Sequence, residues 1–438
     1  MQHILILGIG RSTYYLLQYL HEVLIPQGLS IKAIDVQPDL VAKRQAEFPD
    51  ISFFQSDIHK EALTAIIPEA DIVVSMLPPA FHSMVAELCL EHYKHFFTAS
   101  YVSKEIKALD EAAKEKGLLF LMECGLDPGI DHMSAMAMIH NLQDKGASIE
   151  SFESYTGGLV HPSNLNPPWN YKISWNPRNV VLAGQGNAVQ YKENGIVKIV
   201  PYQRLFKEPS KWKISDSEIY EGYPNRDSLS YQFLYNLQDT KTFIRGTLRY
   251  PGFCEGWNYL VQLGLTDDTI ILPEDSKRTA RSFLNHFLSA DNSLEDQLKS
   301  IFKESADKAL SYIKALGLTE EVPLMIKAAT SAQILQSILE NQWKMQESDK
   351  DRIIMIHRIQ YILQGQRQLL QSTLIVDGED AERTAMAKTV GLPLAIAIEL
   401  FVKNQIHTRG IVIPTSKEVY EPILHKLKES GIVFHEGY

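Results

Sequence analysis

Two glycines near the start of the chain stand where a strand would turn into a helix. Gly8 and Gly10 follow the apolar run Ile4–Leu7 and precede Ser12–Val23, a stretch with helical periodicity. Gly8 would let the chain turn sharply, and Gly10 would let the backbone approach a pyrophosphate at the helix N-terminus. Glycine also serves simple tight turns, so this pair alone is weak evidence for a nucleotide site.

The predicted phosphate loop lacks the third glycine of the usual dinucleotide fingerprint, because position 13 is threonine. Its N-terminal position, the strand and helix pattern that follows and an acidic residue ending the second strand still favour nucleotide binding. The predicted loop residues are Gly8, Gly10, Arg11, Ser12 and Thr13.

Asp35 ends the second predicted strand and would select the cofactor. A carboxylate there accepts hydrogen bonds from the adenosine ribose hydroxyls and repels a 2′-phosphate. No arginine follows directly, since the next residues are Val36, Gln37, Pro38 and Asp39. The alternative is that Asp35 caps the next helix, a role that suits Asp39 better. We therefore predict NAD rather than NADP.

Four further residues follow the third and fourth predicted strands. The carboxyl ends of parallel strands line the ligand crevice of a doubly wound sheet, although such residues can equally be ordinary loop residues. These candidates for cofactor binding are Asp57, Ile58, Met76 and Leu77.

Three arginines could bind an anionic substrate on an otherwise acidic protein. Arg226, Arg245 and Arg249 lie close together in a chain of net charge −10. Arginine binds carboxylates through two parallel hydrogen bonds. Arg226 ranks first, because Pro224 and Asn225 before it predict a stiff turn. The alternative is a structural ion pair, for example with Asp227 or Glu255.

The elements that would position these residues begin as alternating strands and helices. Short apolar runs at residues 4–7, 31–35, 52–56, 71–77, 95–99 and 118–123 are separated by segments with helical periodicity. This alternation predicts an α/β fold with a doubly wound parallel sheet covered on both faces.

The pattern changes after about residue 126. Residues 151–250 are rich in glycine, proline, asparagine and aromatics, which favours a second, more antiparallel sheet with long loops. We predict a dinucleotide-binding domain at 1–126 rejoined by about 390–438. The substrate-binding domain would comprise 127–265 and about 350–389, and a helical insert about 266–349.

Composition excludes several classes of function. The net charge of −10 argues against nucleic acid or an anionic membrane as the main partner. Three separated cysteines and no CxxC pair give no support for a disulfide framework or a zinc site, so we expect no metal. No uninterrupted apolar run approaches 20 residues, and the chain begins with a strand pattern, so we expect a cytoplasmic protein.

Six ordered motifs give the chain a resemblance to a known family. TASYVS (98–103), GLDPGIDH (125–132), SYTGG (154–158), YKISW (171–175), YPNRDS (223–228) and RGTLRY (245–250) follow the N-terminal glycine pair. The chain closely resembles the glutamate-forming saccharopine dehydrogenases, with distinctive motifs as far as about Gly264. The resemblance implies interconversion of saccharopine with 2-aminoadipate semialdehyde and glutamate, a Rossmann-type domain, a second α/β domain with a helical insert, and a dimer.

The resemblance also implies particular substrate contacts. It places Arg226, Thr247 and Leu248 against the substrate, with Ser100, Tyr101 and Asp127 at the crevice edge. It further implies contact of Ser174 with the cofactor. Gly157 and Gly158 would allow close backbone approach, or simply form a turn. From their chemistry, Asp127 and Tyr101 are the candidates for acid–base catalysis. Asp127 also has a plain structural explanation, since Asp-Pro-Gly favours a turn by itself.

Two alternatives stay open. One is a related enzyme acting on another secondary amine, such as a carboxynorspermidine dehydrogenase, although a polyamine substrate would need acidic anchors in place of Arg226 and Arg249. The other is a non-catalytic NAD-binding regulatory protein. His132, at the start of an apolar helix, could lie near the crevice, but we expect a capping or packing role for it. The NADP-dependent fungal members carry a basic residue where Asp35 stands here, so the resemblance does not carry NADP across.

Overall fold

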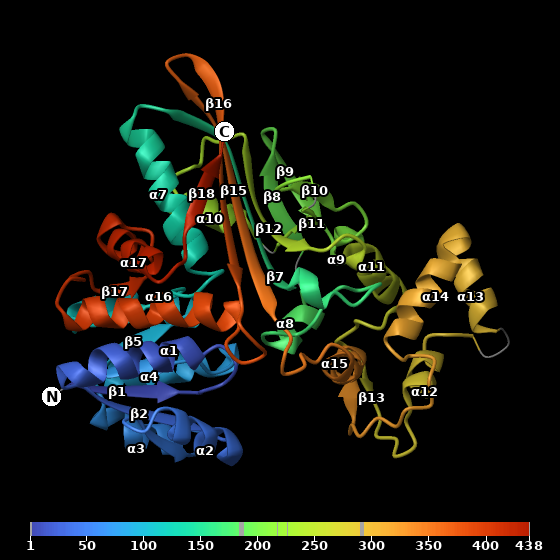
Figure 1. Ribbon diagram of the computed structural model, residues 1–438, viewed down its shortest axis with the longest axis horizontal. Helices are drawn as coiled ribbons and strands as arrows, with labels where there is room; N and C mark the ends of the chain where they lie inside the picture. Colours follow the sequence, from blue (N-terminus) through green and yellow to red (C-terminus); the bar gives the residue numbers. More distant parts are fainter. Residues whose placement is uncertain (1, 184–187, 217, 226, 290–292, 438) are drawn as a thin grey trace. The chain divides into compact units, whose positions relative to one another are not determined.

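The computed structural model describes residues 2–183, 188–216, 218–225, 227–289 and 293–437 (Figure 1). The chain forms two compact units. The first comprises Met1–Ile149, Ile362–Arg367 and Leu374–His435, and the second comprises Glu150–Tyr361, Gln368–Thr373 and Glu436–Tyr438.

The first unit is built on a seven-stranded parallel sheet in the order β17-β6-β5-β4-β1-β2-β3. Strand β4 is buried throughout and β1 from Ile4 to Leu7, as expected for strands that are covered on both faces. This confirms the predicted α/β class. The strands are β1 (His3–Leu7), β2 (Ser30–Asp35), β3 (Ser52–Gln55), β4 (Ile72–Ser75), β5 (His95–Thr98), β6 (Leu119–Leu121) and β17 (Gly410–Val412).

Helices alternate with these strands, as predicted. The segment after the glycine pair starts as α1 (Tyr14–Tyr19) and continues as one π-helical turn over Leu20–Leu24. The segment with helical periodicity between the predicted strands 95–99 and 118–123 forms two helices, α5 (Lys104–Lys107) and α6 (Asp110–Glu115). The other helices of this unit are α2 (Pro38–Glu47), α3 (Lys60–Ile66), α4 (His82–Glu91), α7 (Ile130–Asp144), α16 (Ala385–Val402) and α17 (Lys417–Glu429).

Helix α16 is the most apolar helix of the first unit. By length and composition it could cross a membrane, but 78% of it is buried within the structure. It packs against α1, and these two helices run side by side in Figure 1. A Cβ added at Gly391 would lie 2.7 Å from the backbone nitrogen of Leu16, so the two helices approach closely at that glycine. This burial is typical of a core helix.

The second unit contains a mixed sheet of nine strands. Seven follow the order β10-β11-β12-β7-β15-β16-β18, while β8 pairs with β12 and β9. Strands β7 and β12 are parallel and β11 and β12 antiparallel, so the sheet is less uniformly antiparallel than its sequence pattern suggests. The strands are β7 (Ser148–Val160), β8 (Val189–Glu193), β9 (Ile196–Val200), β10 (Ser210–Lys213), β11 (Ile219–Pro224), β12 (Thr242–Arg249), β15 (Asp351–Leu363), β16 (Gln366–Asp377) and β18 (Phe434–Gly437).

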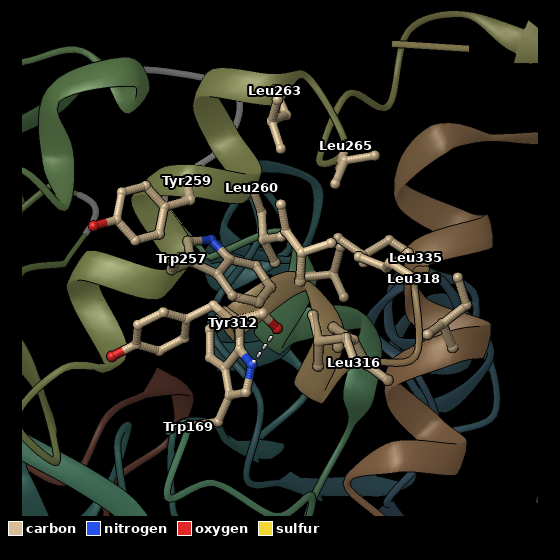
Figure 2. Packing of buried hydrophobic residues seen from close by; sticks show 14 of the residues in the cluster. Trp169, Trp257, Tyr259, Leu260, Leu263, Leu265, Tyr312, Leu316, Leu318 and Leu335 are labelled. Carbon is tan, nitrogen blue, oxygen red and sulfur yellow. Dashed lines mark hydrogen bonds between the residues drawn. The ribbon is translucent and has the colours of Figure 1, made fainter. Parts of the chain in front are cut away.

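An aromatic and leucine-rich core joins the helices of this unit (Figure 2). Trp169, from the loop after β7, donates a hydrogen bond from Nε1 to the carbonyl oxygen of Tyr312 at 3.1 Å. Trp257 and Leu335 contribute to the same cluster. The helices are α8 (Pro177–Val181), α9 (Tyr202–Leu205), α10 (Leu229–Leu234), α11 (Phe253–Leu263), α12 (Ala280–Asn285), α13 (Leu294–Phe302), α14 (Ala306–Ala315) and α15 (Ser331–Gln342), with the short strands β13 (Ile271–Leu272) and β14 (Ala329–Thr330).

The division into units differs from the expected domain boundaries. The first unit continues through α7 to Ile149 instead of ending at residue 126, and it includes the chain from Leu374 instead of from about 390. Helix α7 carries ten buried residues, including Met133, Met136 and Met138, so it packs as a core helix of the first unit. The helices of the predicted insert share the core of the second unit.

Candidate functional site

The glycine loop of the first unit has the geometry that the sequence predicts. Gly8 has a φ of +88° and donates its N–H to the carbonyl oxygen of Ile34 at 2.9 Å. A Cβ added there would lie 3.1 Å from the carbonyl oxygen of Met76. Gly10 is exposed, and a Cβ added there would meet nothing within 4 Å. The backbone conformation of Gly8 is therefore fixed by its neighbours, whereas at Gly10 there is free space for a ligand to approach the backbone.

The start of α1 is suited to an anion. Thr13 precedes the helix and is buried, but its hydroxyl donates to the carbonyl oxygen of Gly10 at 2.7 Å and makes no hydrogen bond to the helix N–H groups. Those N–H groups therefore lack a side-chain cap, and Arg11 beside them is exposed. Uncapped helix N–H groups next to an open glycine fit the diphosphate of a dinucleotide.

Asp35 contacts the glycine loop directly. One carboxylate oxygen accepts the backbone N–H of Ile9 at 2.9 Å, and the other accepts the N–H of Gln37 at 3.0 Å. The side chain lies at the carboxyl end of β2, and only 8% of the residue is exposed. The position is the one where a carboxylate meets the adenosine ribose in dinucleotide-binding sheets.

The four predicted cofactor contacts after β3 and β4 lie at the same edge of the sheet. Strand β1 pairs with β2 on one side and β4 on the other, so the loops after these strands are neighbours. The N–H of Met76 bonds the carbonyl oxygen of Leu7 at 2.8 Å, which continues this pairing into the loop after β4. Leu77 is half-buried, whereas Asp57 is exposed and Ile58 half-buried beyond the outer strand β3. The order reverses between β1 and β4, where such sheets bind ligands.

The structure brings the two predicted catalytic residues together. The hydroxyl of Tyr101, after β5, donates to Oδ1 of Asp127, after β6, at 3.2 Å. Both residues are half-buried, and Ser100 lies beside Tyr101 at the end of β5. A phenol donating to a carboxylate at the carboxyl edge of the sheet can orient a substrate amine or move a proton.

A buried group of two carboxylates and an imidazole, which we name the Glu123–His132–Asp131 cluster, contacts the segments that carry this pair. Nε2 of His132 is 2.9 Å from Oε2 of Glu123, and its Nδ1 is 3.5 Å from Oδ2 of Asp131. None of the three is more than 3% exposed. The sequence predicts a capping or packing role for His132 and does not predict its pairing with Glu123. Only the apolar sequence around His132 signals its burial.

In the second unit, β7 and β12 carry predicted substrate residues on one shared face. The parallel register pairs Arg245 with Ser154 and Thr247 with Thr156. Alternation along each strand therefore puts Arg245, Thr247 and Arg249 on the same face as Thr156. Thr247 is half-buried, and Gly158, which follows on that face of β7, is half-buried too. The paired strands thus gather cations and hydroxyls on one surface.

Gly157 and Leu248 belong to the opposite face. A Cβ added at Gly157 would lie 2.9 Å from the Leu248 Cβ and carbonyl oxygen, and the Leu248 side chain is fully buried. The sheet therefore separates the Leu248 side chain from that of Thr247. Any contact of Leu248 with a ligand on the Thr247 face would involve its backbone.

The two described arginines have different surroundings. The Arg245 guanidinium lies 4.0 Å from the centre of the Tyr231 ring. Arg249 is 3% exposed and lies over the rings of Tyr171, Tyr223 and Phe253 at 5.2 to 5.9 Å. Burial raises the pKa of Tyr223 to about 12, so this phenol supplies no negative charge to the guanidinium. Aromatic faces stabilise the buried cation.

Thr156 is a polar residue that the sequence reading missed. Its hydroxyl is buried and, within the part of the chain that the structure describes, makes no hydrogen bond. Buried hydroxyls usually have a partner, so a ligand group is a reasonable one. The sequence gives no sign of this, because which face Thr156 occupies depends on the strand register.

Two further predicted residues complete the set. Arg226 lies outside the described residues, so its placement is not stated. Ser174 is 5% exposed and follows Ile173, which bridges to Lys344. Across the described ranges, no group of three histidine, cysteine or acidic residues could hold a metal ion.

Family comparisons cover almost the whole chain. The saccharopine dehydrogenase NADP binding domain matches residues 4–121, and the saccharopine dehydrogenase C-terminal domain matches residues 125–432. The chain is also similar to a solved structure, the apo saccharopine dehydrogenase (L-Glu forming) from Saccharomyces cerevisiae. The two share a TM-score of 0.88 and 27% identity over 100% of this chain and 99% of that one.

Curated relatives include both single enzymes and longer proteins. The saccharopine dehydrogenase [NADP(+), L-glutamate-forming] of Schizosaccharomyces pombe is 32% identical over 100% of this chain and 99% of its own length. The alpha-aminoadipic semialdehyde synthase of Arabidopsis thaliana is 35% identical over 88% of this chain, but the match spans only 38% of that protein. The corresponding rat mitochondrial protein is 32% identical over 99% of this chain and 47% of its length.

The structural features and the family matches point to the same family. These features are the glycine loop, the Rossmann-type sheet and the paired strands β7 and β12. The chain belongs to the saccharopine dehydrogenase (L-glutamate-forming) family.

Proposed function

We propose that the chain catalyses the glutamate-forming saccharopine dehydrogenase reaction and prefers NAD to NADP. Saccharopine, water and oxidised cofactor would give 2-aminoadipate 6-semialdehyde, glutamate, reduced cofactor and a proton, or the reverse. Membership of the family makes the chain an NAD(P)-dependent oxidoreductase acting on a secondary amine in lysine metabolism. The cofactor preference is the finer part of the proposal.

The position of Asp35 carries the preference for NAD. Its carboxylate bonds the N–H of Ile9 inside the glycine loop, and a fixed negative charge there repels a 2′-phosphate. Lys43 and Arg44, the first basic residues after Asp35, are both ion-paired with Glu382. The curated fungal relatives are named as NADP(+) enzymes, so this chain would differ from them in cofactor.

When bound, the nicotinamide would accept hydride from the substrate carbon next to the secondary nitrogen. Water then hydrolyses the resulting imine, and the C–N bond breaks to release the semialdehyde and glutamate. The Tyr101 hydroxyl donates to Asp127 at 3.2 Å, which supports a role for this pair in orienting the amine or accepting its proton. The task of these side chains would be mainly to hold the substrate in one geometry.

The three substrate carboxylates need cationic and hydroxyl partners. Arg245, Thr247 and Thr156 share one face of the second unit and support binding there. Arg226 keeps its predicted role as first carboxylate anchor. Replacing it by alanine should raise the KM for saccharopine strongly and leave the Kd for NAD unchanged, whereas an unchanged KM would remove Arg226 from the site.

The deciding experiment follows saccharopine-dependent reduction of NAD and of NADP by absorbance. A higher kcat/KM with NAD supports the whole proposal, and a clear preference for NADP overturns the cofactor assignment while leaving the reaction standing. NAD binding without turnover would favour a regulatory protein, and turnover of carboxynorspermidine instead would favour the other enzyme.

A cytoplasmic homodimer is part of the proposal, and light scattering in solution tests the dimer.

A further inference from the structure

The Glu123–His132–Asp131 cluster is the most thoroughly buried group of ionisable side chains near Tyr101 and Asp127. Its members come from the loop after β6 and from the first turn of α7. Removing two carboxylates and an imidazole from water is costly unless each is hydrogen-bonded. Each ring nitrogen of His132 faces a carboxylate oxygen: Nε2 lies 2.9 Å from Oε2 of Glu123, and Nδ1 lies 3.5 Å from Oδ2 of Asp131. Such an arrangement fixes the ring on both sides.

The Glu123 end of the cluster holds the segment that carries Tyr101. The N–H of Glu123 donates to the carbonyl oxygen of Ser100 at 3.0 Å, and its Oε1 accepts the N–H of Val102 at 3.0 Å. Both neighbours of Tyr101 are therefore bonded to Glu123. This residue adopts a φ of +55°, which a non-glycine residue rarely accepts unless its surroundings enforce it.

The Asp131 end holds the turn that carries Asp127. Oδ1 of Asp131 accepts the N–H of Gly129 at 2.6 Å, and its own N–H donates to the carbonyl oxygen of Leu126 at 3.0 Å. A Cβ added at Gly129 would lie 2.1 Å from the carbonyl oxygen of Gly125, so the turn is closely packed. Leu126 and Gly129, which flank the Asp127–Pro128 pair, are thus both bonded to Asp131.

We propose that the Glu123–His132–Asp131 cluster is a positioning device that holds the Tyr101 hydroxyl against the Asp127 carboxylate. His132 joins the two ends, because it contacts Glu123 through Nε2 and Asp131 through Nδ1. The inference rests on the proposed function, since it needs Tyr101 and Asp127 to act on the substrate. Glu123, His132 and Asp131 act through these two residues and need not touch the substrate themselves.

The experiment uses the full-length protein and two conservative variants. In H132Q the amide nitrogen replaces Nε2 opposite Glu123 and the contact to Asp131 is lost. In E123Q the acceptor for Val102 is kept and one carboxylate is removed. The matched control is H140Q, because His140 lies on the same helix and instead contacts the hydroxyl of Tyr420 at 2.8 Å. Each protein is assayed for kcat and KM with saccharopine, for the Kd of NAD, and for its unfolding midpoint.

We expect both cluster variants to lower kcat at least about tenfold with KM changed by less than about threefold, as for other supporting residues around a reactive group. H140Q should retain wild-type kcat, and all three variants should bind NAD normally. The decisive test combines H132Q with D127N. If His132 acts through Asp127, the double variant should fall no more than about twofold below D127N alone.

Several outcomes would overturn the inference. If the reductions in kcat caused by H132Q and by D127N multiply in the double variant, His132 acts independently of Asp127. If D127N alone keeps full activity, the cluster has no catalytic group to position. Lowered stability with unchanged kcat per folded molecule would assign the cluster to the core alone. So would failure of both cluster variants to fold while H140Q folds. Wild-type protein inactive with saccharopine would refute the proposed function, a separate result.

Discussion

At the scale of single residues, two glycines two positions apart have different tasks. Gly8 needs its freedom for the backbone, since its φ is +88° and Met76 lies close by. Gly10 has neither constraint: no atom within 4 Å would meet an added Cβ. The folded protein alone therefore gives no reason for glycine at position 10, whereas a closely bound diphosphate does.

Replacing Gly10 by alanine should separate cofactor binding from folding. We expect the Kd for NAD to rise at least about tenfold, which corresponds to about 1.4 kcal/mol. The free energy of unfolding without cofactor should change by less than about 0.5 kcal/mol, as for surface substitutions. Calorimetric titration and urea unfolding measure the two quantities. Wild-type affinity in Gly10→Ala would contradict a diphosphate at this loop.

The comparison variant is Gly8→Ala, which should lose stability before any ligand is added. Forcing a non-glycine residue into the left-handed region costs about 1–2 kcal/mol, and contact with the Met76 carbonyl adds to it. A Gly8→Ala protein as stable as wild type would show that this loop relaxes freely.

His95 should make the first unit sensitive to acid. Its Nδ1 accepts the N–H of Leu119 at 3.0 Å, so the folded state requires an unprotonated nitrogen there. Burial, with the Arg409 guanidinium nearby, lowers its pKa to about 4, below the value of about 6.5 in an unfolded chain. The unfolded state therefore binds more protons between these values, and stability falls as the pH drops from about 6.5 to about 4.

The variant His95→Asn tests this directly, because an amide oxygen can accept the Leu119 N–H without titrating. Urea unfolding at pH 8 and at pH 5 should show a smaller loss of stability in the variant than in wild type. Equal losses in both proteins would place the acid sensitivity elsewhere, for example at His82, whose pKa is also lowered to about 4 by burial.

At the scale of elements, helix packing around the glycine loop makes its own prediction. Gly391 in α16 faces the backbone of Leu16 in α1, the helix that starts directly after the loop. Alanine there would improve helix propensity but push the helices apart, and overpacking of this kind costs about 1–3 kcal/mol. We expect Gly391→Ala to lower the thermal midpoint and weaken NAD binding. The control is Gly437→Ala, where an added Cβ meets nothing within 4 Å, and its thermal midpoint and NAD affinity should match wild type. A more stable Gly391→Ala protein would contradict the close approach.

Local sequence predicted the parallel sheet because each of its strands is a short apolar run that carries its own signal. Local sequence did not predict the features that depend on contacts between residues far apart in the chain. The stretch 104–116 contains no glycine or proline, yet it splits near Asp110, whose carboxylate accepts the N–H of Ile411 from 301 residues away. The partners Glu123 and His132, and the face occupied by Thr156, also depend on how elements pack, so the pattern of single segments could not reveal them.

At the scale of the whole molecule, the chain passes between its two units several times. The segments 362–367 and 374–435 belong to the first unit and 368–373 to the second. Neither unit is thus one continuous stretch of sequence. Helix α7 belongs to the first unit, although the predicted boundary at residue 126 assigns it to the other domain, because its periodic sequence does not say which sheet it covers. Each unit has its own core, and the glycine loop belongs to the first.

Because the predicted cofactor residues other than Ser174 lie in the first unit, ligand binding should raise the stability of the molecule in a cofactor-specific way. A ligand present at 100 times its Kd stabilises the folded state by about 2.7 kcal/mol. We expect NAD to raise the thermal midpoint more than NADP does at equal concentration, since Asp35 opposes the 2′-phosphate. Scanning calorimetry with each cofactor measures this without any turnover. The Gly10→Ala protein is the control, because a tenfold weaker Kd should reduce its stabilisation by NAD to about 1.4 kcal/mol or less at the same concentration. A larger shift with NADP would mean that Asp35 does not select the cofactor, even if saccharopine is the substrate.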